Sequence, residues 1–370
     1  MRGETVRYRA RVKSHGREVA TRVFTRKGDA VAWEHDQRRS LRAGEWIDPR
    51  RARIPLARLE SGWRESRQGL KRKSLEADLS AWRNHVEPKF GDTPLASITR
   101  AQIEQWVGSL IAGGVAPATA RRYLATLRSV LAFAVADNRL TRNPAVGIRV
   151  SSTRGGRREG QFLTHAELDA LADACRGTYG DVVLVLGLCG LRRGEPAGLK
   201  VADTIQVPGP GLRVQRTVLA SSADGALYED TPKTGRVRTV PLPQRAADVI
   251  LNRAEGRTAT DWIFAAPAGG PLSESNWKRS VAWAAATEAI GRPGLRVHGL
   301  RHTSASLWLA SGADPKVVQR VLGHASAAMT MDLYGHLIDQ NLLAAADRIG
   351  GTTGAQAPGR GMQKAPGRDL

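Results

Sequence analysis

The first 55 residues contain two short runs in which large apolar and polar positions alternate. Residues 8–12 and 19–24 both show this period of two, which is typical of strands with one buried face. A glycine-containing stretch between them favours a hairpin turn. Residues 28–41 are then predicted to form a helix. We therefore expect residues 1–55 to form a small module.

The pattern changes to a helical period in residues 56–150. The clearest case runs from Thr119 to Asn138, where apolar residues recur at i, i+3, i+7 and i+11. These residues are Leu124, Leu127, Leu131 and Val135. Pro117 stands where a helix tolerates proline, because the first turn does not need its N–H. The whole region is predicted to be helical, with the apolar stripe in its core.

A third region follows a short linker. Residues 151–160 are rich in serine, glycine and arginine, which is the composition of a linker. Thr164 and Glu167 then have the spacing of a capping box, which opens a helix. We expect residues 161–349 to form one larger domain.

This larger domain is predicted to be mostly helical, with one strand pair near residues 212–219 and 236–241. Residues 350–370 are rich in glycine, proline and alanine and are expected to be a disordered tail. The fold class is therefore mainly α with small β-sheets. No internal repeat interrupts this organisation.

Composition adds a partner class to this picture. A chain of 370 residues with 41% apolar residues has room for two or three domains with real cores. Its net charge of +21 favours a polyanionic partner. Of its 56 basic residues, 46 are arginine, and arginine binds phosphate with two parallel hydrogen bonds. A GC-biased genome would also explain the arginine-to-lysine ratio, but not the excess of positive charge.

Two groups of basic residues are candidates for DNA contacts. One face of the first predicted strand carries Arg7, Arg9, Arg11 and Lys13, because side chains on a strand repeat every second residue. The predicted helix at 119–138 carries three arginines that lie mostly off its apolar stripe: Arg121, Arg122 and Arg128. Either group is also compatible with an ordinary solvated face.

Other features of the sequence indicate where the protein is located and whether it binds a metal or a cofactor. Cys175 and Cys189 lie in apolar surroundings and are expected to be buried thiols, since no cysteine or histidine spacing fits a metal site. The longest apolar run, 182–191, is too short to span a bilayer. The arginine-rich N-terminus lacks the apolar segment of a secretory signal. We expect a cytoplasmic, DNA-associated protein of a bacterial cell, with no membrane contact, no cofactor and no metal.

Six positions in the third region stand out as candidates for chemistry. They occur in the order Arg192, Lys233, His298, Arg301, His324 and Tyr334. Arg192 follows a Gly-Leu pair at the end of an apolar helix, and Lys233 lies in the turn of the predicted strand pair. His298 and Arg301 stand at i and i+3, so they project from one helix face. Taken singly, each residue is more often structural; the joint order is what carries weight.

These motifs resemble the catalytic motifs of the tyrosine recombinase, or phage integrase, family. The resemblance covers residues 160–345 and implies an α+β catalytic domain in which Tyr334 attacks a DNA phosphate. It also implies, less specifically, that 1–55 is an arm-type DNA-binding module with a β-sheet and 56–150 a helical core-binding DNA domain. Gly299 and Pro196 depart from residues that many members have, and they put only the local helix geometry in doubt.

The residue types suit this reaction. Negative charge gathers on the phosphoryl oxygens in the transition state, and Arg192 and Arg301 offer donors for those oxygens. A tyrosine hydroxyl is protonated at neutral pH, and His298 can take its proton. The resemblance assigns protonation of the leaving 5′ oxygen to Lys233. His324 is expected to hydrogen-bond the phosphate or brace Tyr334.

The expected function is site-specific recombination that integrates or excises a phage or mobile element. The expected partners are double-stranded DNA attachment sites, a tetramer of this chain on DNA, and directionality or host DNA-bending factors. The segment 337–349 is a candidate for docking on a neighbouring copy, or equally for packing on its own domain. The module at 1–55 favours an element integrase over an Xer-type resolvase. A type IB topoisomerase and a non-catalytic DNA-binding protein remain the alternatives.

Overall fold

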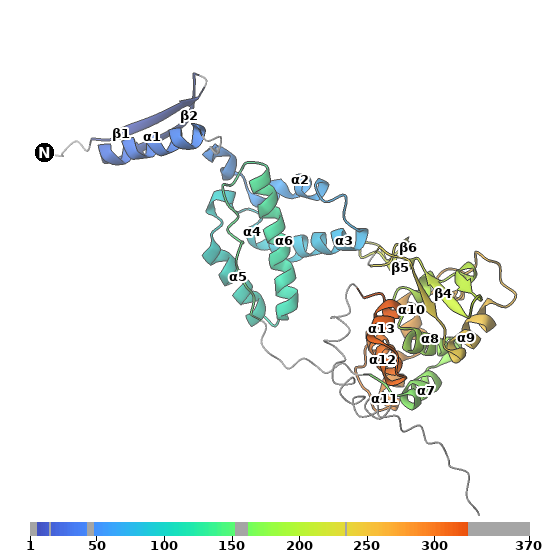
Figure 1. Ribbon diagram of the computed structural model, residues 1–370. Coiled ribbons are helices and arrows are strands. Elements are labelled where there is room, and N and C mark those ends of the chain that lie inside the picture. The colour runs from blue at the N-terminus through green and yellow to red at the C-terminus, as the bar shows by residue number, and fades with distance from the viewer. Residues whose placement is uncertain (1–5, 15, 43–47, 152–161, 234, 325–370) are drawn as a thin grey trace, which may run out of the picture. The chain divides into compact units, whose positions relative to one another are not determined.

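The computed structural model describes residues 6–14, 16–42, 48–151, 162–233 and 235–324. The chain divides into two compact units, each with its own core (Figure 1). The first comprises Met1–Arg157 and Ser221–Asp224, and the second comprises Arg158–Ala220 and Gly225–Leu370.

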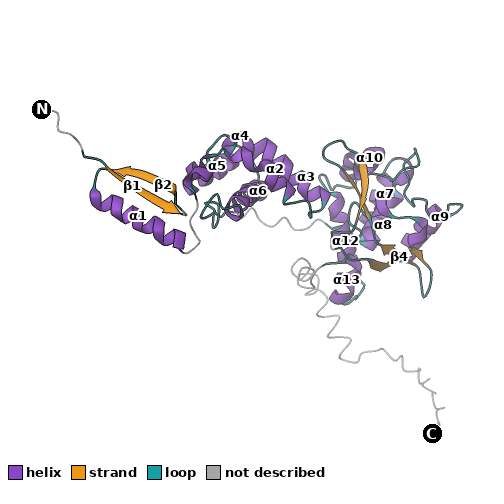
Figure 2. Cartoon of the chain, turned by 90° about the horizontal axis from the view of Figure 1, so that it is seen from above, coloured by secondary structure: helices purple, strands orange, loops and turns teal. Residues whose placement is uncertain are grey.

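The N-terminal module is a two-stranded antiparallel sheet covered by one helix. Strands β1 (Tyr8–Ser14) and β2 (Arg17–Phe24) pair, and helix α1 (Lys27–Arg42) packs on them, as both views show (Figures 1 and 2). Ala10 and Val12 are buried because they point from β1 towards the helix side. The predicted strands and helix are confirmed.

The opposite face of β1 is basic and open to solvent. Arg9, Arg11 and Lys13 alternate with the buried residues of β1 and are all exposed, as is Arg7, which directly precedes the strand. Across the strand pair, Arg9 stands opposite Val23, an apolar residue that is also exposed. The predicted basic strand face is therefore present.

Every regular element in the described residues 56–150 is helical, as the sequence predicts. The α-helices are α2 (Glu60–Glu65), α3 (Arg72–Ala81), α4 (Glu87–Phe90), α5 (Arg100–Ala112) and α6 (Pro117–Ala136). A π-helical turn, Trp82–Val86, joins α3 to α4, and short 3₁₀ helices lie at Pro49–Arg53, Leu56–Leu59 and Leu95–Ser97. Helix α6 starts at Pro117 and buries Leu124, Leu127 and Leu131. Three of the four residues of the predicted stripe therefore lie in the core, and the fourth, Val135, is only partly buried.

The second unit is built around one apolar helix, α8 (Asp181–Cys189). Val182, Val183 and Val185 to Cys189 are all buried, because neighbouring elements cover this helix on all sides. Its packing partners include α7 (His165–Ala174), α9 (Gln244–Ala254) and α12 (Val297–Ala310). The other helices of this unit are α10 (Glu274–Ser280), α11 (Trp283–Ala289) and α13 (Pro315–Leu322), with 3₁₀ turns at Gly177–Tyr179, Pro196–Gly198 and Val201–Asp203. The predicted capping box opens α7, and both cysteines are buried.

The strands of the second unit differ in part from the prediction. Strands β3 (Thr204–Ile205), β4 (Gly211–Val214) and β7 (Arg238–Pro241) form one antiparallel sheet, so the expected pairing of 212–214 with 238–241 is confirmed. Residues 217–219, however, do not continue β4. They belong to β5 (Thr217–Ala220), which pairs with the unpredicted strand β6 (Leu227–Asp230).

The single predicted strand breaks at Gln215 and Arg216 because both side chains turn to a buried carboxylate. Gln215 Nε2 donates to Asp203 Oδ1 at 2.6 Å, and Arg216 Nη1 donates to Asp203 Oδ2 at 2.5 Å. Because β5 and β6 come between β4 and β7 in the sequence, Lys233 does not lie in the turn of a β4–β7 hairpin. It lies in the segment that connects β6 to β7, and this part of the prediction is wrong.

Several predictions fall on residues outside the described ranges. These are Tyr334, the docking segment 337–349, the tail 350–370 and nearly all of the linker 151–160. Among the described helices, none is both long enough and apolar enough to cross a bilayer.

Candidate active site

The site begins where α8 ends. Gly190 closes the helix with a φ of +62°, and a Cβ there would lie 2.4 Å from a methyl carbon of Leu322. A glycine is therefore required by both the backbone and the space. The chain then turns to Arg192, whose Nη2 donates to the carbonyl of Gly323 at 2.6 Å. The predicted glycine at the helix end thus directs Arg192 towards the end of α13.

A buried carboxylate accepts hydrogen bonds from Arg192. Glu195, only 1% exposed, accepts the backbone N–H of Arg192 at 2.7 Å and its Nη1 at 3.1 Å. The same carboxylate receives two parallel hydrogen bonds from Arg238, of 2.8 and 2.6 Å. Burial acts to raise the pKa of Glu195, but the hydrogen bonds and charges of Arg238 and Arg192 outweigh it and lower the pKa. Glu195 is therefore an anion between two arginines.

Helix α12 supplies the second arginine. Arg301 is 4% exposed, and its Nη1 and Nη2 donate to the carbonyls of Gly190 and Leu322 at 2.5 and 2.6 Å. A guanidinium can make both bonds at once because its donors lie in one rigid plane. One turn earlier on α12, His298 is exposed, and its ring lies 5.2 Å from that of His302.

Helix α13 brings in the last described member of the site. Asp314 caps its start by accepting the N–H of Lys316 at 2.6 Å, and Gly323 ends it with a φ of +67°. His324 follows at once and is half-buried. Its main chain is fixed by Gln319, whose carbonyl accepts the His324 N–H at 3.1 Å and whose amide donates to the His324 carbonyl at 3.2 Å.

Both histidines have lowered pKa values. Desolvation is the largest cause for His298, followed by the positive charges of His302 and Arg301, and its pKa falls to about 4. The pKa of His324 also falls to about 4, through desolvation and then the charges of Arg301 and Arg192. Because His298 is exposed, water screens part of the effect of these charges. The lowered pKa favours the neutral form of the ring. Both rings are neutral at neutral pH and can accept a proton.

The structure thus brings together four of the six sequence-predicted residues from three distant segments: Arg192, His298, Arg301 and His324. Lys233 is exposed, and no hydrogen bond or ion pair described for it joins it to these four. Tyr334 lies outside the described residues, ten positions after His324. His302 joins the cluster as a neighbour of His298.

The DNA-contact candidates on α6 divide into two kinds. Arg128 donates to the carbonyls of Ala145 and Ile148 at 3.2 and 3.1 Å, so its guanidinium holds the chain that follows the helix. Arg121 makes one longer bond, of 3.4 Å, to the carbonyl of Val150, and Arg122 is exposed. Arg121 and Arg122 are therefore better placed than Arg128 to meet an external phosphate.

Two site residues were missed by the sequence reasoning. Glu195 stands three positions after Arg192, and opposite charges at that spacing were an available signal. Arg238 gave no such signal, because a lone arginine in a predicted strand is expected to face solvent. Its side chain is only 9% exposed, since it is satisfied by partners far away in sequence.

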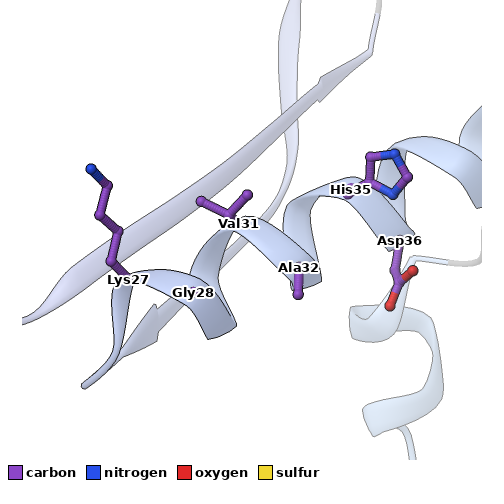
Figure 3. Close-up of a pocket in the computed structure, with 6 residues that line it drawn as sticks. All are labelled: Lys27, Gly28, Val31, Ala32, His35 and Asp36. Atoms are coloured by element: carbon purple, nitrogen blue, oxygen red, sulfur yellow. The ribbon is translucent and has the colours of Figure 1, made fainter.

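A shallow hollow on α1 lies apart from this chemistry. It is lined by Lys27, Gly28, Val31, Ala32, His35 and Asp36, all from α1 itself (Figure 3). None of the candidate catalytic residues contributes to it. Within the described ranges, no three His, Cys, Asp or Glu side chains gather in a way that could hold a metal ion.

Comparison with known proteins places the chain in a family. The sequence profile of the phage integrase family matches residues 161–341, and that of the phage integrase central domain matches residues 56–150. A putative prophage integrase of Mycobacterium tuberculosis is 28% identical over 325 residues, covering 85% of this chain and 84% of the relative. The tyrosine recombinase XerC of Halalkalibacterium halodurans is 28% identical over 285 residues, covering 73% and 87%.

Solved structures share the fold. The integrase of the transposon Tn1549, in complex with a circular intermediate DNA, matches with a TM-score of 0.67 and 18% identity, over 80% of this chain and 99% of that chain. A lambda integrase tetramer bound to a Holliday junction matches with a TM-score of 0.56 and 21% identity, over 84% and 89%.

The two sequence profiles together cover most of the chain, and they define the class as tyrosine-type enzymes of site-specific DNA recombination. The chain belongs to the phage integrase family.

Proposed function

We propose that this integrase cleaves and rejoins double-stranded DNA attachment sites through a covalent 3′-phosphotyrosine on Tyr334. The observation that carries the proposal is the convergence of Arg192, His298, Arg301 and His324 at the end of α13. Two guanidinium groups and two neutral imidazoles beside one another suit a phosphodiester that must be both stabilised and attacked.

In the proposed reaction the Tyr334 oxygen attacks the scissile phosphorus and the bond to the 5′ oxygen breaks. Arg192 and Arg301 hydrogen-bond the non-bridging oxygens, on which negative charge accumulates. A guanidinium has five N–H donors, and the described side-chain bonds of Arg192, one to Glu195 and one to Gly323, use two of them. Donors therefore remain on Arg192 for a phosphate.

Proton movements follow from the charge states. His298 is neutral and accepts the Tyr334 proton as the tyrosine oxygen bonds to phosphorus. Lys233 donates a proton to the leaving 5′ oxygen, which departs as a hydroxyl. His324 hydrogen-bonds the phosphate or braces Tyr334. In the second step a 5′ hydroxyl of the partner strand attacks the phosphotyrosine, and the protons return by the same routes.

The remaining parts of the chain are assigned to DNA contact and assembly. The exposed basic face of β1, with Arg7, Arg9 and Arg11, binds the backbone of arm-type sites. The helical region at 56–150, through Arg121 and Arg122, contacts the core site. The active assembly is a tetramer on DNA that integrates or excises a mobile element, with accessory or host DNA-bending factors setting direction.

A covalent trapping assay tests the nucleophile. Wild type and Tyr334→Phe are incubated with nicked duplexes taken from the DNA that flanks the gene, and denaturing gels resolve protein–DNA adducts. We expect an adduct with wild type and none with Tyr334→Phe, because only the attacking oxygen is removed. The matched control is Tyr8→Phe, which removes one hydroxyl from a tyrosine of the N-terminal module and is expected to keep the adduct.

The other outcomes have defined meanings. An adduct that survives in Tyr334→Phe contradicts the nucleophile assignment. Tight DNA binding without an adduct in any variant contradicts strand cleavage and favours the non-catalytic alternative. Relaxation of a supercoiled plasmid that lacks the flanking DNA indicates topoisomerase activity without site specificity.

A further inference from the structure

The C-terminal end of α13 is contacted by three arginines from three different segments. Its last carbonyls, those of Val321, Leu322 and Gly323, accept hydrogen bonds in that order from Arg238 Nε at 3.0 Å, Arg301 Nη2 at 2.6 Å and Arg192 Nη2 at 2.6 Å. The final carbonyls of a helix have no partner within the helix and carry partial negative charge. All three guanidinium groups are thus held by hydrogen bonds to the same helix end.

We propose that Arg238 is a positioning residue for strand cleavage, acting through Glu195 and the end of α13 on the orientation of Arg192. The proposal rests on the proposed function, because it takes Arg192 as a phosphate ligand. Arg238 itself is not expected to touch DNA. Its side chain is only 9% exposed, and both of its Nη groups face the Glu195 carboxylate.

The geometry makes Arg238 the connection between two supports of Arg192. It donates two hydrogen bonds to Glu195, and Glu195 in turn accepts hydrogen bonds from both the backbone and the side chain of Arg192. It also grips the Val321 carbonyl, two residues before the Gly323 carbonyl that Arg192 binds. Arg238 therefore fixes how far the Arg192 loop stands from the helix end.

The space around Gly323 shows how closely these parts fit. A Cβ on Gly323 would lie 2.9 Å from Arg238 Cδ and 3.6 Å from Arg192 Nη1. The aliphatic stem of Arg238 therefore occupies the room that a side chain would take, and the guanidinium of Arg192 lies alongside. A shorter side chain at 238 removes two of the four hydrogen bonds described for the Glu195 carboxylate and the one that Arg238 donates to the Val321 carbonyl.

Loss of this support lowers the rate more than the affinity. Many phosphate contacts along the duplex determine DNA binding, whereas the transition state needs Arg192 in one orientation. Around metal ions, removal of a residue that orients a ligating side chain typically costs on the order of 10- to 100-fold in affinity or activity, and we take the same magnitude for a residue that orients Arg192. We expect Arg238→Gln to reduce the single-turnover cleavage rate constant by that factor, with less than a roughly threefold change in DNA dissociation constant, because the phosphate contacts elsewhere are kept.

The experiment measures single-turnover cleavage of a nicked duplex from the flanking DNA at saturating full-length protein. The matched control is Arg253→Gln. Arg253 also binds a carboxylate with two hydrogen bonds, to Asp181 at 2.5 and 2.8 Å, and also reaches a carbonyl, but at the other end of α8. Thermal unfolding of both variants is recorded, and cleavage is measured well below both transitions. Equal loss of cleavage in the two variants would mean that Arg238 acts only through stability.

Two further experiments distinguish a positioning role of Arg238 from a purely structural one: a substrate with an uncharged scissile group, and the Arg192→Ala background. With a methylphosphonate at the scissile position, one non-bridging oxygen and its charge are gone, so the effect of Arg238→Gln is expected to shrink. In an Arg192→Ala background, Arg238→Gln is expected to add less than about a twofold loss. A full, multiplicative loss in either test overturns the proposal.

The same series keeps the proposed function separately testable. If Arg192→Ala cleaves like wild type, the phosphate role of Arg192 fails, whatever Arg238 does. If Arg238→Gln does not fold, Arg238→Lys keeps the charge on a single nitrogen that cannot make two parallel bonds to Glu195. Its expected rate lies between those of wild type and Arg192→Ala. A wild-type rate in Arg238→Gln contradicts positioning, and so does a wild-type rate in Arg238→Lys where Arg238→Gln does not fold.

Discussion

Single arginine side chains in this site bind main-chain carbonyls of two helix ends with one guanidinium, and in the proposed function the same group also binds a phosphate. Arg301 illustrates this, because it joins the end of α8 to the end of α13 by bonds to Gly190 and Leu322. A lysine carries the same charge but cannot direct two donors in one plane. Charge alone is therefore insufficient at this position.

Arg301→Lys is expected to lose both cleavage and stability. Cleavage should fall on the order of 10²- to 10³-fold, as for loss of one transition-state donor. The free energy of unfolding should fall by about 1–3 kcal/mol, because a buried carbonyl is left without its donor. Trapping assays and urea unfolding measure the two effects. Arg292→Lys, at a partly exposed pair with Glu167, is the control and should change stability by less than about 1 kcal/mol. Unchanged cleavage in Arg301→Lys would argue against a phosphate contact.

The lowered pKa values of His298 and His324 predict an acid-sensitive fold. Each folded pKa is about 4, below the ordinary value of 6.5, so between these values the unfolded chain binds more protons than the folded one. Stability is therefore fully present above pH 6.5 and is lost as the pH falls towards 4. Urea midpoints measured at several pH values from about 7.5 down to about 4.5 should fall less steeply in His324→Gln than in wild type. Parallel curves over this range would contradict a depressed pKa, and the slopes at higher pH should agree in either case.

At the scale of elements, the hydrophobic pattern predicted the helices well and the strands only in part. α6 and α7 follow from local signals, a leucine stripe and a capping box. β5 could not be separated from β4, since what breaks them apart is the buried Asp203, which is remote in sequence from Gln215. The contacts of Arg238 were unpredictable for the same reason. Identity and order of the catalytic candidates were readable, but the carbonyls that orient them were not.

The end of α13 has little room for an added methyl group. Gly323→Ala is expected to cost roughly 1–2 kcal/mol for the positive φ, plus the displacement of Arg238, whose Cδ would lie 2.9 Å from the new methyl group. Gly291→Ala is the matched control, because Gly291 has a φ of +68° and no neighbouring atom within 4 Å of the position that a Cβ would take. Both variants should lose stability in thermal unfolding, but only Gly323→Ala should also lose cleavage. Equal cleavage in the two would show that the helix end tolerates a shift of Arg238.

At the scale of the whole molecule, the excess of arginine has more than one use. Arg128, Arg238 and Arg301 all donate to carbonyls of the described chain, so part of the arginine content serves the fold. The arginines of β1 differ, because they stand on an exposed strand face. Total charge therefore overstates the DNA-facing surface, and the position of each arginine decides its role.

The two sides of the N-terminal module allow the position of charge to be tested with two variants of equal net charge. Replacing Arg7, Arg9 and Arg11 by glutamine removes three charges from the open face of β1, and replacing Arg38, Arg39 and Arg42 removes three from α1. Both changes lower the net charge from +21 to +18, by subtraction of three.

If the β1 face binds DNA, only the first variant should reduce the salt dependence of binding to the flanking DNA. The logarithmic slope should then fall by roughly 0.9 for each phosphate that an arginine no longer neutralises. Cleavage of a short nicked core duplex should stay within about twofold in both, because the proposed catalytic arginines lie in another unit. Equal salt slopes in the two variants would mean that the position of the charge on the module does not affect DNA binding. That result would contradict the assignment of the β1 face as a DNA-binding surface.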